Sequence, residues 1–354
     1  TWTLNAPQGF KISMIAKNLQ KPRWLALTPD GDLLVTETYE NRILRFHDND
    51  GDGVPEMKEV FATEKNGLNM PFGMAFTKDA FYLGNNDALV KFPYTKGQKE
   101  ISGEGQRLME FPTSHHWTRD VAIPKSEDWI YVSIGSGSNV SAEDPPRASV
   151  MRIKPEGGKA EIYAFGLRNP VDISFHPQTG ELYTSVNERD GLGDDLVPDY
   201  ITRVGQGGFY GWPYAYLKPE NIEPRQVDWN GKSKRPDLVA KTVSPDVPVE
   251  AHAAVMQMAF PKGTMFPERY RNGIFVAMRG SWNSSVAHGY KIAFVPFKDG
   301  KPTGGYEDFI TGFVMDAAKP AVWGRPVGAI FLEDGSLVFT DEENGRLYRV
   351  TYAQ

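Results

Sequence analysis

The chain has 354 residues, with 39 Lys and Arg against 45 Asp and Glu, and its formal net charge is −6. This balance argues against nucleic acid as a partner, because phosphates favour a net basic surface. No apolar run approaches the roughly 18 residues of a membrane-spanning helix. The absence of cysteine excludes disulfides, zinc–thiolate sites, iron–sulfur clusters and covalent CxxCH haem.

A four-strand unit recurs along the whole chain. In residues 19–46, LQKPRWLALTPDGDLLVTETYENRILRF, short apolar strands alternate with turns rich in Pro, Asp, Gly and Asn. Alternation bounded by such turns is the hairpin signal. Because large folds are often built by copying one unit, the repeats predict an all-β fold, a six-bladed β-propeller with four-stranded blades. The units cover residues 19–46, 68–92, 116–139, 167–188, 254–283 and 323–350.

The N-terminal segment 9–16, GFKISMIA, reads as a lone strand without a neighbouring partner. We expect it to pair with RLYRVTY at 346–352, which would complete the last blade, close the ring and cover a sheet edge. No linker divides the chain, so residues 1–354 are predicted to form a single propeller domain. The stretches 189–205 and 213–252 read as insertions that the repeat does not explain.

An acidic turn follows the first unit. In DNDGDGVPEMKE, residues 48–59, carboxylates and a glycine occupy positions 1, 3, 5, 6 and 12 as Asp48, Asp50, Asp52, Gly53 and Glu59. This spacing folds oxygen ligands around a hard cation. We interpret it as a structural Ca²⁺ site between the first two blades, although its flanks read as strands. An acidic hairpin without metal remains the alternative.

Polar residues gather where the innermost strands of the blades begin. Two residues before the proline-like start of each inner strand lie Gln20, Asn69, His116, Arg168, Ala253 and Gly324. One residue before it lie Lys21, Met70, Trp117, Asn169, Ala254 and Arg325. Since these positions meet at one end of the channel, they predict a polar site there.

The stretch SHHWTRD, residues 114–120, contributes two of the six histidines. Neighbours on an extended segment point to opposite sides, so we assign His116 to the channel and His115 to solvent or packing. A histidine is a good proton acceptor near neutral pH, and arginines bind carboxylates and developing oxyanions. This set suits an anionic cofactor and an alcohol or hemiacetal. The GSGSN turn at 135–139 is no GxGxxG and lacks a βαβ unit, which disfavours nicotinamide.

Several motifs together resemble the soluble quinoprotein sugar dehydrogenases, in particular the sorbosone or aldose dehydrogenase branch, which uses pyrroloquinoline quinone (PQQ). They are HWTRD (116–120), GLRNP (166–170), NERDGLGDD (187–195), GGFYGWP (207–213), GSWN (280–283) and WGRPVG (323–328). The resemblance implies oxidation of a sugar by hydride transfer to PQQ.

The same resemblance assigns site residues. It implies that His116 is the general base, that Arg168 and Asn169 contact the quinone carbonyl, and that Arg325 holds a PQQ carboxylate. It also implies a Ca²⁺ ion held partly by main-chain carbonyls of the loop Arg189, Asp190 and Gly191.

The chain departs from the family's glucose enzymes at three places. Their Arg-x-Arg becomes Arg325-Pro326-Val327 here, and their cofactor lysine has no clear counterpart. The residue before the base is an Asp in those enzymes and His115 in this chain, so the group that orients His116 stays open. The remaining candidate cofactor contacts are Asn69, Arg279, Trp282 and Asn283.

Two other functions remain open. A calcium-dependent propeller hydrolase of the lactonase type would use metal-activated water, but the channel-end positions above hold no acid. A non-catalytic propeller that binds a partner through its loops leaves the convergence of His, Arg and Asn unexplained.

The electrons of a sugar oxidation must leave the protein, since nothing in the sequence indicates a second redox centre. We therefore expect an external acceptor, a small quinone or a separate cytochrome. The chain begins at Thr1, which is compatible with a removed signal peptide, and a periplasmic location is expected.

Overall fold

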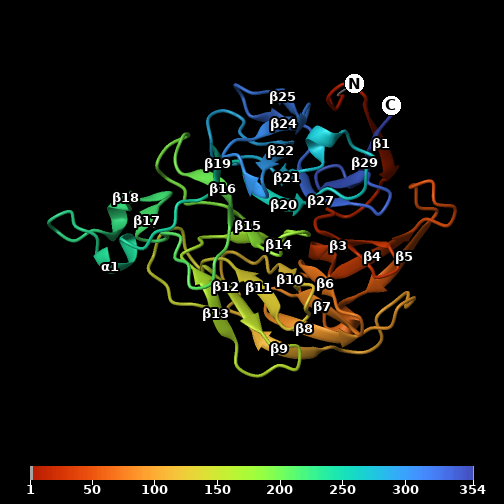
Figure 1. The fold of residues 1–354 in the computed structure, drawn as a ribbon, viewed down its shortest axis with the longest axis horizontal. Helices are drawn as coiled ribbons and strands as arrows, with labels where there is room; N and C mark the ends of the chain where they lie inside the picture. Colours follow the sequence, from red (N-terminus) through yellow and green to blue (C-terminus); the bar gives the residue numbers. More distant parts are fainter. Residues whose placement is uncertain (1–2, 354) are drawn as a thin grey trace.

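The structure is a computed structural model that describes residues 3–353. Six four-stranded antiparallel sheets surround a central axis, which confirms the predicted six-bladed propeller (Figure 1). The first three blades, from the axis outward, are β2(Leu25–Leu27), β3(Leu33–Glu37), β4(Arg42–His47), β5(Met57–Ala62); β6(Met74–Phe76), β7(Ala80–Gly84), β8(Ala88–Pro93), β9(Gln106–Glu110); and β10(Val121–Ala122), β11(Ile130–Ile134), β12(Ser149–Ile153), β13(Glu161–Phe165).

The other three blades follow in chain order. They are β14(Pro170–Phe175), β15(Leu182–Val186), β16(Pro198–Arg203), β19(Val247–Ala251); β20(Val255–Ala259), β21(Gly273–Met278), β22(Lys291–Lys298), β24(Glu307–Ile310); and β27(Pro326–Phe331), β28(Leu337–Asp341), β29(Arg346–Tyr352), β1(Phe10–Ala16).

Burial of the strands follows their place in a blade. All residues of β3, β7, β15 and β21 are buried, and these strands are accordingly rich in Val, Leu, Ile and Phe. The outer strand β5 alternates half-buried and exposed residues until its last two positions. The core therefore lies between neighbouring sheets, and the polar ends of the strands remain for the two ends of the channel.

The N-terminal strand closes the ring as predicted. β1 pairs antiparallel with β29, with Phe10 opposite Tyr352. The Phe10 ring also packs edge-on against Phe266, 4.8 Å away between centroids, and against Phe309 at 4.9 Å. Because both rings belong to the preceding blade, this strand joins two blades as well as the two ends of the chain.

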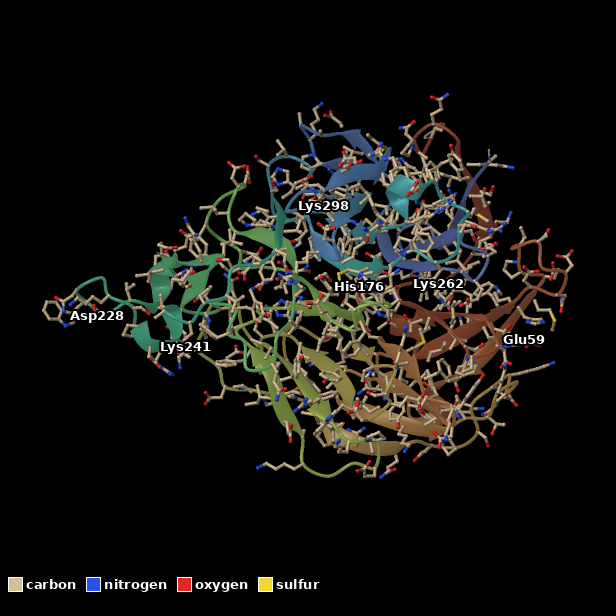
Figure 2. All side chains as sticks on the ribbon, in the orientation of Figure 1. Glu59, His176, Asp228, Lys241, Lys262 and Lys298 are labelled. Atoms are coloured by element: carbon tan, nitrogen blue, oxygen red, sulfur yellow. The ribbon has the colours of Figure 1, made fainter. Side chains whose placement is uncertain are left out.

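The unexplained stretch after residue 212 forms a projection from the fourth blade. It contains β17(Ala215–Tyr216), β18(Lys218–Ile222), the turn η3(Pro224–Gln226) and the short helix α1(Pro236–Val239). Figure 2 shows Asp228 and Lys241 on this projection, well away from the ring. Further short elements are η1(Thr38–Glu40), η2(Glu64–Asn66), η4(Glu268–Tyr270), β23(Lys301–Pro302), β25(Val314–Asp316) and β26(Ala321–Val322). Among the described residues, no helix is long and apolar enough to span a membrane.

Buried polar side chains connect the innermost strands across the axis. Asp120, just before β10, accepts hydrogen bonds from the Trp24 indole at 2.9 Å and from the Ile173 amide at 2.8 Å. Asp172 on β14 accepts one from the Met258 amide on β20. Each bond joins a different pair of blades.

Gln257 on β20 extends this network to the first and last blades. Its Nε2 donates to the carbonyl of Leu25 at 2.7 Å, and its Oε1 accepts from the amides of Leu25 and Ala329 at 3.1 and 3.2 Å. The inner strands are only two to six residues long, so these side chains supply hydrogen bonds that the short sheets do not.

The two aspartates share one buried environment. Burial raises the pKa of Asp120 to about 6, and burial together with the Asp120 charge raises the pKa of Asp172 well above its ordinary value. Two like charges cannot both persist at close range without water, so Asp172, whose pKa the Asp120 charge raises further, is the member of the pair that holds a proton more readily.

Asp172→Asn should flatten the pH dependence of stability. A carboxyl whose pKa is raised on folding stabilises the fold at low pH and loses this contribution as pH rises through the folded pKa. We expect the free energy of unfolding of the native protein, relative to the variant, to fall by about 2 kcal/mol as pH rises from 4 to 7. Denaturant unfolding across this range measures it, with the exposed Asp299→Asn as control; parallel curves for native protein and Asp172→Asn would contradict it.

Candidate active site

A cavity of about 370 Å³ opens at the end of the channel where the inner strands begin. Its size falls within the range of small-molecule sites. It is lined by Arg23, Tyr39, His115, His116, Trp117, Thr118, Arg168, Asn169, Val171, Asn187, Glu188, Asp190, Asp199, His252, Ala254, Met256, Arg279, Trp282 and Asn283. The segments 115–118, 168–171 and 252–256 supply ten of these nineteen residues. Five of the twelve positions in the predicted register line the cavity, namely His116, Trp117, Arg168, Asn169 and Ala254, and the other seven do not.

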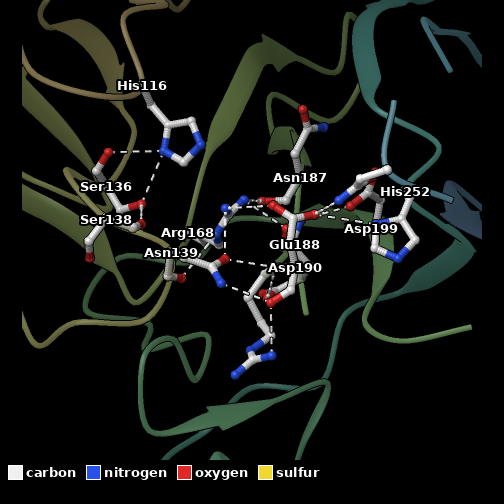
Figure 3. Close-up of polar contacts among 12 residues, drawn as sticks. His116, Ser136, Ser138, Asn139, Arg168, Asn187, Glu188, Asp190, Asp199 and His252 are labelled. Carbon is white, nitrogen blue, oxygen red and sulfur yellow. Dashed lines mark hydrogen bonds and ion pairs between the residues drawn. The ribbon is translucent and has the colours of Figure 1, made fainter. Parts of the chain in front are cut away.

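His116 lies half-buried at one side of the cavity (Figure 3). Its Nδ1 is 2.9 Å from the carbonyl oxygen and 3.0 Å from the hydroxyl of Ser136. Burial, the Arg168 charge and neighbouring His115 hold the pKa of His116 well below its ordinary value. The imidazole is therefore neutral at pH 7 and available as a proton acceptor.

Arg168 is held on all sides of its guanidinium. Nε and Nη2 donate to the main-chain and side-chain oxygens of Asn139 at 3.2 and 3.0 Å. Nη1 donates to the carbonyls of Asn187 and Glu188, and Nη2 also reaches the Asp190 carboxylate at 3.2 Å (Figure 3). These contacts use all its N–H directions, so the charge is fixed in place beside the cavity.

Three carboxyl groups lie on the cavity wall. Both oxygens of Asp199 accept main-chain amides, from Glu188 at 2.7 Å and from Ala254 at 2.8 Å. Burial raises the pKa of Glu188 and of Asp199 to about 7. Asp190 is half-buried, and its carboxylate contacts His252 at 3.3 Å and Asn283 at 2.9 Å besides Arg168.

Two arginines face the cavity, Arg23 from the first blade and Arg279 from the fifth. Glu342, almost fully buried, forms ion pairs with both Arg23 and Arg279. Burial opposes the ionisation of Glu342, but the two guanidinium charges outweigh it and lower its pKa. Two arginines share one carboxylate, which leaves net positive charge for an anionic ligand.

Buried polar atoms without a protein partner line the same cavity. They are Arg23 Nε, Thr118 Oγ1, Asn169 Oδ1, Glu188 Oε1 and Asn283 Oδ1. An unpaired buried polar atom costs roughly 1–3 kcal/mol, and a side chain that turned its polar atom toward a ligand in the cavity would recover part of this cost. The paired arginines fit the carboxylates of a planar quinone such as PQQ, whereas the unpaired oxygens of Asn169, Glu188 and Asn283 are acceptors that suit N–H or O–H groups of a ligand or substrate.

The structure brings most of the predicted site residues together. His116, Arg168, Asn169, Asp190, Arg279, Trp282 and Asn283 all line the cavity. Asn69 and Arg325 are not among the lining residues. The Arg325 guanidinium lies 5.0 Å from the centre of the Tyr290 ring and donates to the Gly280 carbonyl at 3.3 Å. His115 is exposed, but it also lines the cavity, which corrects its assignment to solvent or packing alone. Its φ of 64° is not that of an extended residue, so its ring does not point away from His116 but lies 4.2 Å from it.

The loop predicted to hold Ca²⁺ by its carbonyls only partly fits that role. The Asp190 carbonyl accepts N–H groups from Asn139 at 2.8 Å and from Arg189 at 2.9 Å, so both its lone pairs are used. No hydrogen bond to the carbonyls of Arg189 or Gly191 is present among residues 3–353. Asp190 contributes its carboxylate to the cavity instead of its carbonyl.

In the acidic turn at 48–59, three of the four predicted carboxylates come together, and Glu56 takes the place predicted for Glu59. Asp48, Asp50 and Asp52 gather with Glu56, their ligand atoms all within 4.8 Å of one another. Glu59 does not belong to this group. It lies on β5 at the outer edge of the first blade (Figure 2) and pairs with Arg45 at 2.6 Å. The strand β5 begins at Met57, which turns position 59 away from the loop.

The sequence alone missed the residues that follow the second strand of a blade. Tyr39, Asn187 and Glu188 stand at such positions, and their loops emerge at the same end of the channel as the inner-strand starts. A second register, counted from the end of each second strand, would have found them. Arg23, Asp199 and His252 carry no such signal.

Family comparison agrees with this geometry. Residues 4–200 and 205–353 match the model of the TrAA12-like family. The chain belongs to the TrAA12-like family. An uncharacterized protein of Borreliella burgdorferi is 30% identical over 367 residues, covering 99% of the chain and 92% of that protein.

Relatives of known activity are PQQ-dependent sugar dehydrogenases. The PQQ-dependent pyranose dehydrogenase of Coprinopsis cinerea is 22% identical over 98% of the chain; the match spans 54% of that enzyme, about half its length. The holo PQQ domain of the pyranose dehydrogenase from this fungus superposes with a TM-score of 0.80, 19% identity and 99% and 97% coverage of the two chains. The family AA12 enzyme of Trichoderma reesei gives a TM-score of 0.83, 18% identity and 100% and 98% coverage. These structures share the fold.

The projection of this TrAA12-like chain is anchored to the site loop by a buried ion pair. Glu223, at the end of the β17–β18 hairpin, accepts from Arg189 at 2.6 Å, and both side chains are at most 3% exposed. Arg189 in turn donates to the Asp190 carbonyl. Glu223 therefore holds, through one arginine, the loop that carries Asp190.

Glu223→Gln should destabilise the protein and loosen the 187–195 loop. Removing one partner of a buried ion pair leaves an uncompensated charge, which costs about 3 kcal/mol. We expect this loss in denaturant unfolding and faster amide hydrogen exchange in residues 187–195. Glu220→Gln, an exposed change on β18, should do neither, and equal stability of the two variants would refute the anchoring role.

Proposed function

We propose that the protein is a PQQ-dependent dehydrogenase that oxidises an aldose or a related sugar or aldehyde and passes the electrons to an external acceptor. The observation that carries this proposal is a neutral His116 facing a cavity whose paired arginines, Arg23 and Arg279, fit the carboxylates of a quinone. Relatives that use PQQ support the choice of cofactor.

The chain's own residues divide the work. PQQ, when bound, supplies the two-electron quinone that accepts hydride. Asn169 lines the cavity and would donate its side-chain N–H to a carbonyl of this ligand, and the arginines around Glu342, Arg23 and Arg279, would hold its carboxylates. His116 takes the hydroxyl proton of the sugar as C–H cleavage proceeds, and Arg168 places a fixed positive charge beside the oxyanion that develops.

The hydrolase alternative has less support. The cavity does contain Glu188, Asp190 and Asp199, which the channel-end register had not predicted. However, Asp199 and Asp190 are bonded to main-chain amides, to Arg168 and to Asn283. Within residues 3–353, the acidic cluster with ligand spacing is the one at Asp48 to Glu56, outside the cavity.

The proposal includes Ca²⁺ and a location. A calcium ion at the quinone and another in the 48–56 turn are both part of it, with the carbonyls of Arg189 and Gly191 available to the first. The acceptor is a small quinone or a cytochrome, since the chain has no cysteine for a second redox centre. We place the protein in the periplasm, where such acceptors and free PQQ are expected.

Dye reduction tests the activity itself. Protein reconstituted with PQQ and Ca²⁺ should bleach an artificial electron acceptor when an aldose is added, and the PQQ absorption should change on reduction. NAD and NADP should stay unreduced. Sugar-dependent NADH formation without any dye, or no dye reduction with a panel of aldoses, would contradict the proposal.

His116→Gln should lower kcat by roughly 100-fold or more, the usual scale for removing a general base. PQQ binding, followed by its absorption spectrum, should survive because the arginines remain. Since burial and Arg168 hold the pKa of His116 well below its ordinary value, the acid limb of the native kcat profile should lie below pH 6.5. His115→Gln is the matched control and should retain most of the activity; the reverse result would place the base at His115.

Asp50→Asn tests the calcium turn separately from the reaction. Ca²⁺ should raise the melting temperature of the native protein, because a cation bound only to the folded state stabilises it. The variant should lose most of this rise and keep most of its turnover at saturating Ca²⁺. A melting temperature that neither Ca²⁺ nor chelator changes in the native protein would refute a structural site here.

A further inference from the structure

The segment Gly135–Asn139, GSGSN, packs directly behind both reactive side chains. Ser136 is fully buried and contacts His116, while its own amide donates to the Arg168 carbonyl at 2.7 Å. Asn139 holds the Arg168 guanidinium and the Asp190 amide. This turn thus connects the base to the fixed charge (Figure 3).

Two oxygens of Ser136, its carbonyl and its hydroxyl, determine the tautomer of His116. The Ser136 hydroxyl donates its proton to the Ser138 carbonyl at 2.6 Å. Toward the imidazole it can therefore present only lone pairs, at 3.0 Å from Nδ1. The Ser136 carbonyl, at 2.9 Å from the same nitrogen, is an acceptor in any case. With two acceptors facing it, Nδ1 must carry the proton.

Nε2 is then the basic nitrogen. No hydrogen bond from the rest of the described chain reaches it, and His116 lines the cavity. We propose that Ser136 is the positioning residue of His116, holding the imidazole in the tautomer that leaves the Nε2 lone pair free for a substrate proton. This inference rests on the proposed function for its use of that proton, but the tautomer itself does not depend on it.

The neighbouring glycine shows how closely this contact is built. A Cβ at Gly135 would lie 2.6 Å from the His116 Cβ and 2.4 Å from Asn169 Oδ1. No side chain fits there without displacing the base or the amide beside it. Gly135 therefore allows Ser136 to approach the His116 ring, and this contact requires a glycine directly before the serine.

A neutral orienting group has a chemical consequence. Where a histidine base is oriented by a carboxylate, that charge stabilises the imidazolium and raises the pKa of the base. Ser136 orients without charge, and Arg168 opposes a second positive charge nearby. The proton taken by His116 is consequently held weakly and is readily released to water in the cavity.

Nitrogen NMR of protein labelled with ¹⁵N-histidine tests the tautomer without any cofactor. Signals of His116 are identified by their loss in His116→Gln. We expect neutral His116 to carry its proton on Nδ1. A protonated Nε2 in the native protein would overturn the proposal. Protonation on Nδ1 in a protein that never reduces dye would support the positioning role and refute the proposed function.

Ser136→Ala tests the hydroxyl. The main-chain carbonyl remains, so one of two acceptors is lost; kcat should fall about 3- to 10-fold, the effect of one hydrogen bond. KM and PQQ binding should stay unchanged, and the Nδ1–H signal of His116 should shift and broaden. The exposed Ser141→Ala on the same loop is the control. A native kcat and an unshifted His116 signal in folded Ser136→Ala, checked by its melting curve, would overturn the proposal.

Discussion

The ring depends on hydrogen bonds that cross from one blade to the next near the axis. Blades pack mainly through apolar side chains, which specify little about the angle between sheets. Asp120, Asp172 and Gln257 add directional bonds to main-chain amides of other blades. Since the site is assembled from loops of different blades, its geometry follows from these contacts. A small rotation of one blade would separate His116 from Arg168.

The arginines of the site are held in place by hydrogen bonds and ion pairs to neighbouring groups. Arg168 uses its N–H groups on carbonyls, on Asn139 and on Asp190, and Arg23 and Arg279 share Glu342. Fixed charges need no reorganisation when a negative charge develops, and this is the basis of electrostatic catalysis. Most of the unpaired atoms in the cavity occur on neutral side chains, namely Thr118, Asn169 and Asn283, and the others belong to Arg23 and Glu188.

Much of the fold and part of the site followed from the sequence. Alternation and turn residues predicted six blades, because these are local patterns repeated along the chain. The closure of β1 on β29 followed from the lone N-terminal strand, which needed a partner to cover a sheet edge. The register of inner-strand starts placed His116 and Arg168 at one end of the channel. It also included Asn69 and Arg325, which are absent from the cavity lining. Side-chain direction at a loop depends on backbone torsions that spacing does not fix.

The sequence by itself determined the architecture, the family and the residue types at the channel end. Tertiary structure alone decided which atoms face the cavity: Glu56 replaced Glu59 in the acidic turn, Ser136 came to face Nδ1 of His116, and Glu223 reached Arg189 from the projection. The reason is physical. Strand patterns arise from interactions between near neighbours in the chain, whereas the contacts of Ser136 and Glu223 join segments whose approach depends on how blades and loops pack. Glu56 takes its place because the strand β5 begins at Met57, a boundary that the spacing of carboxylates does not reveal.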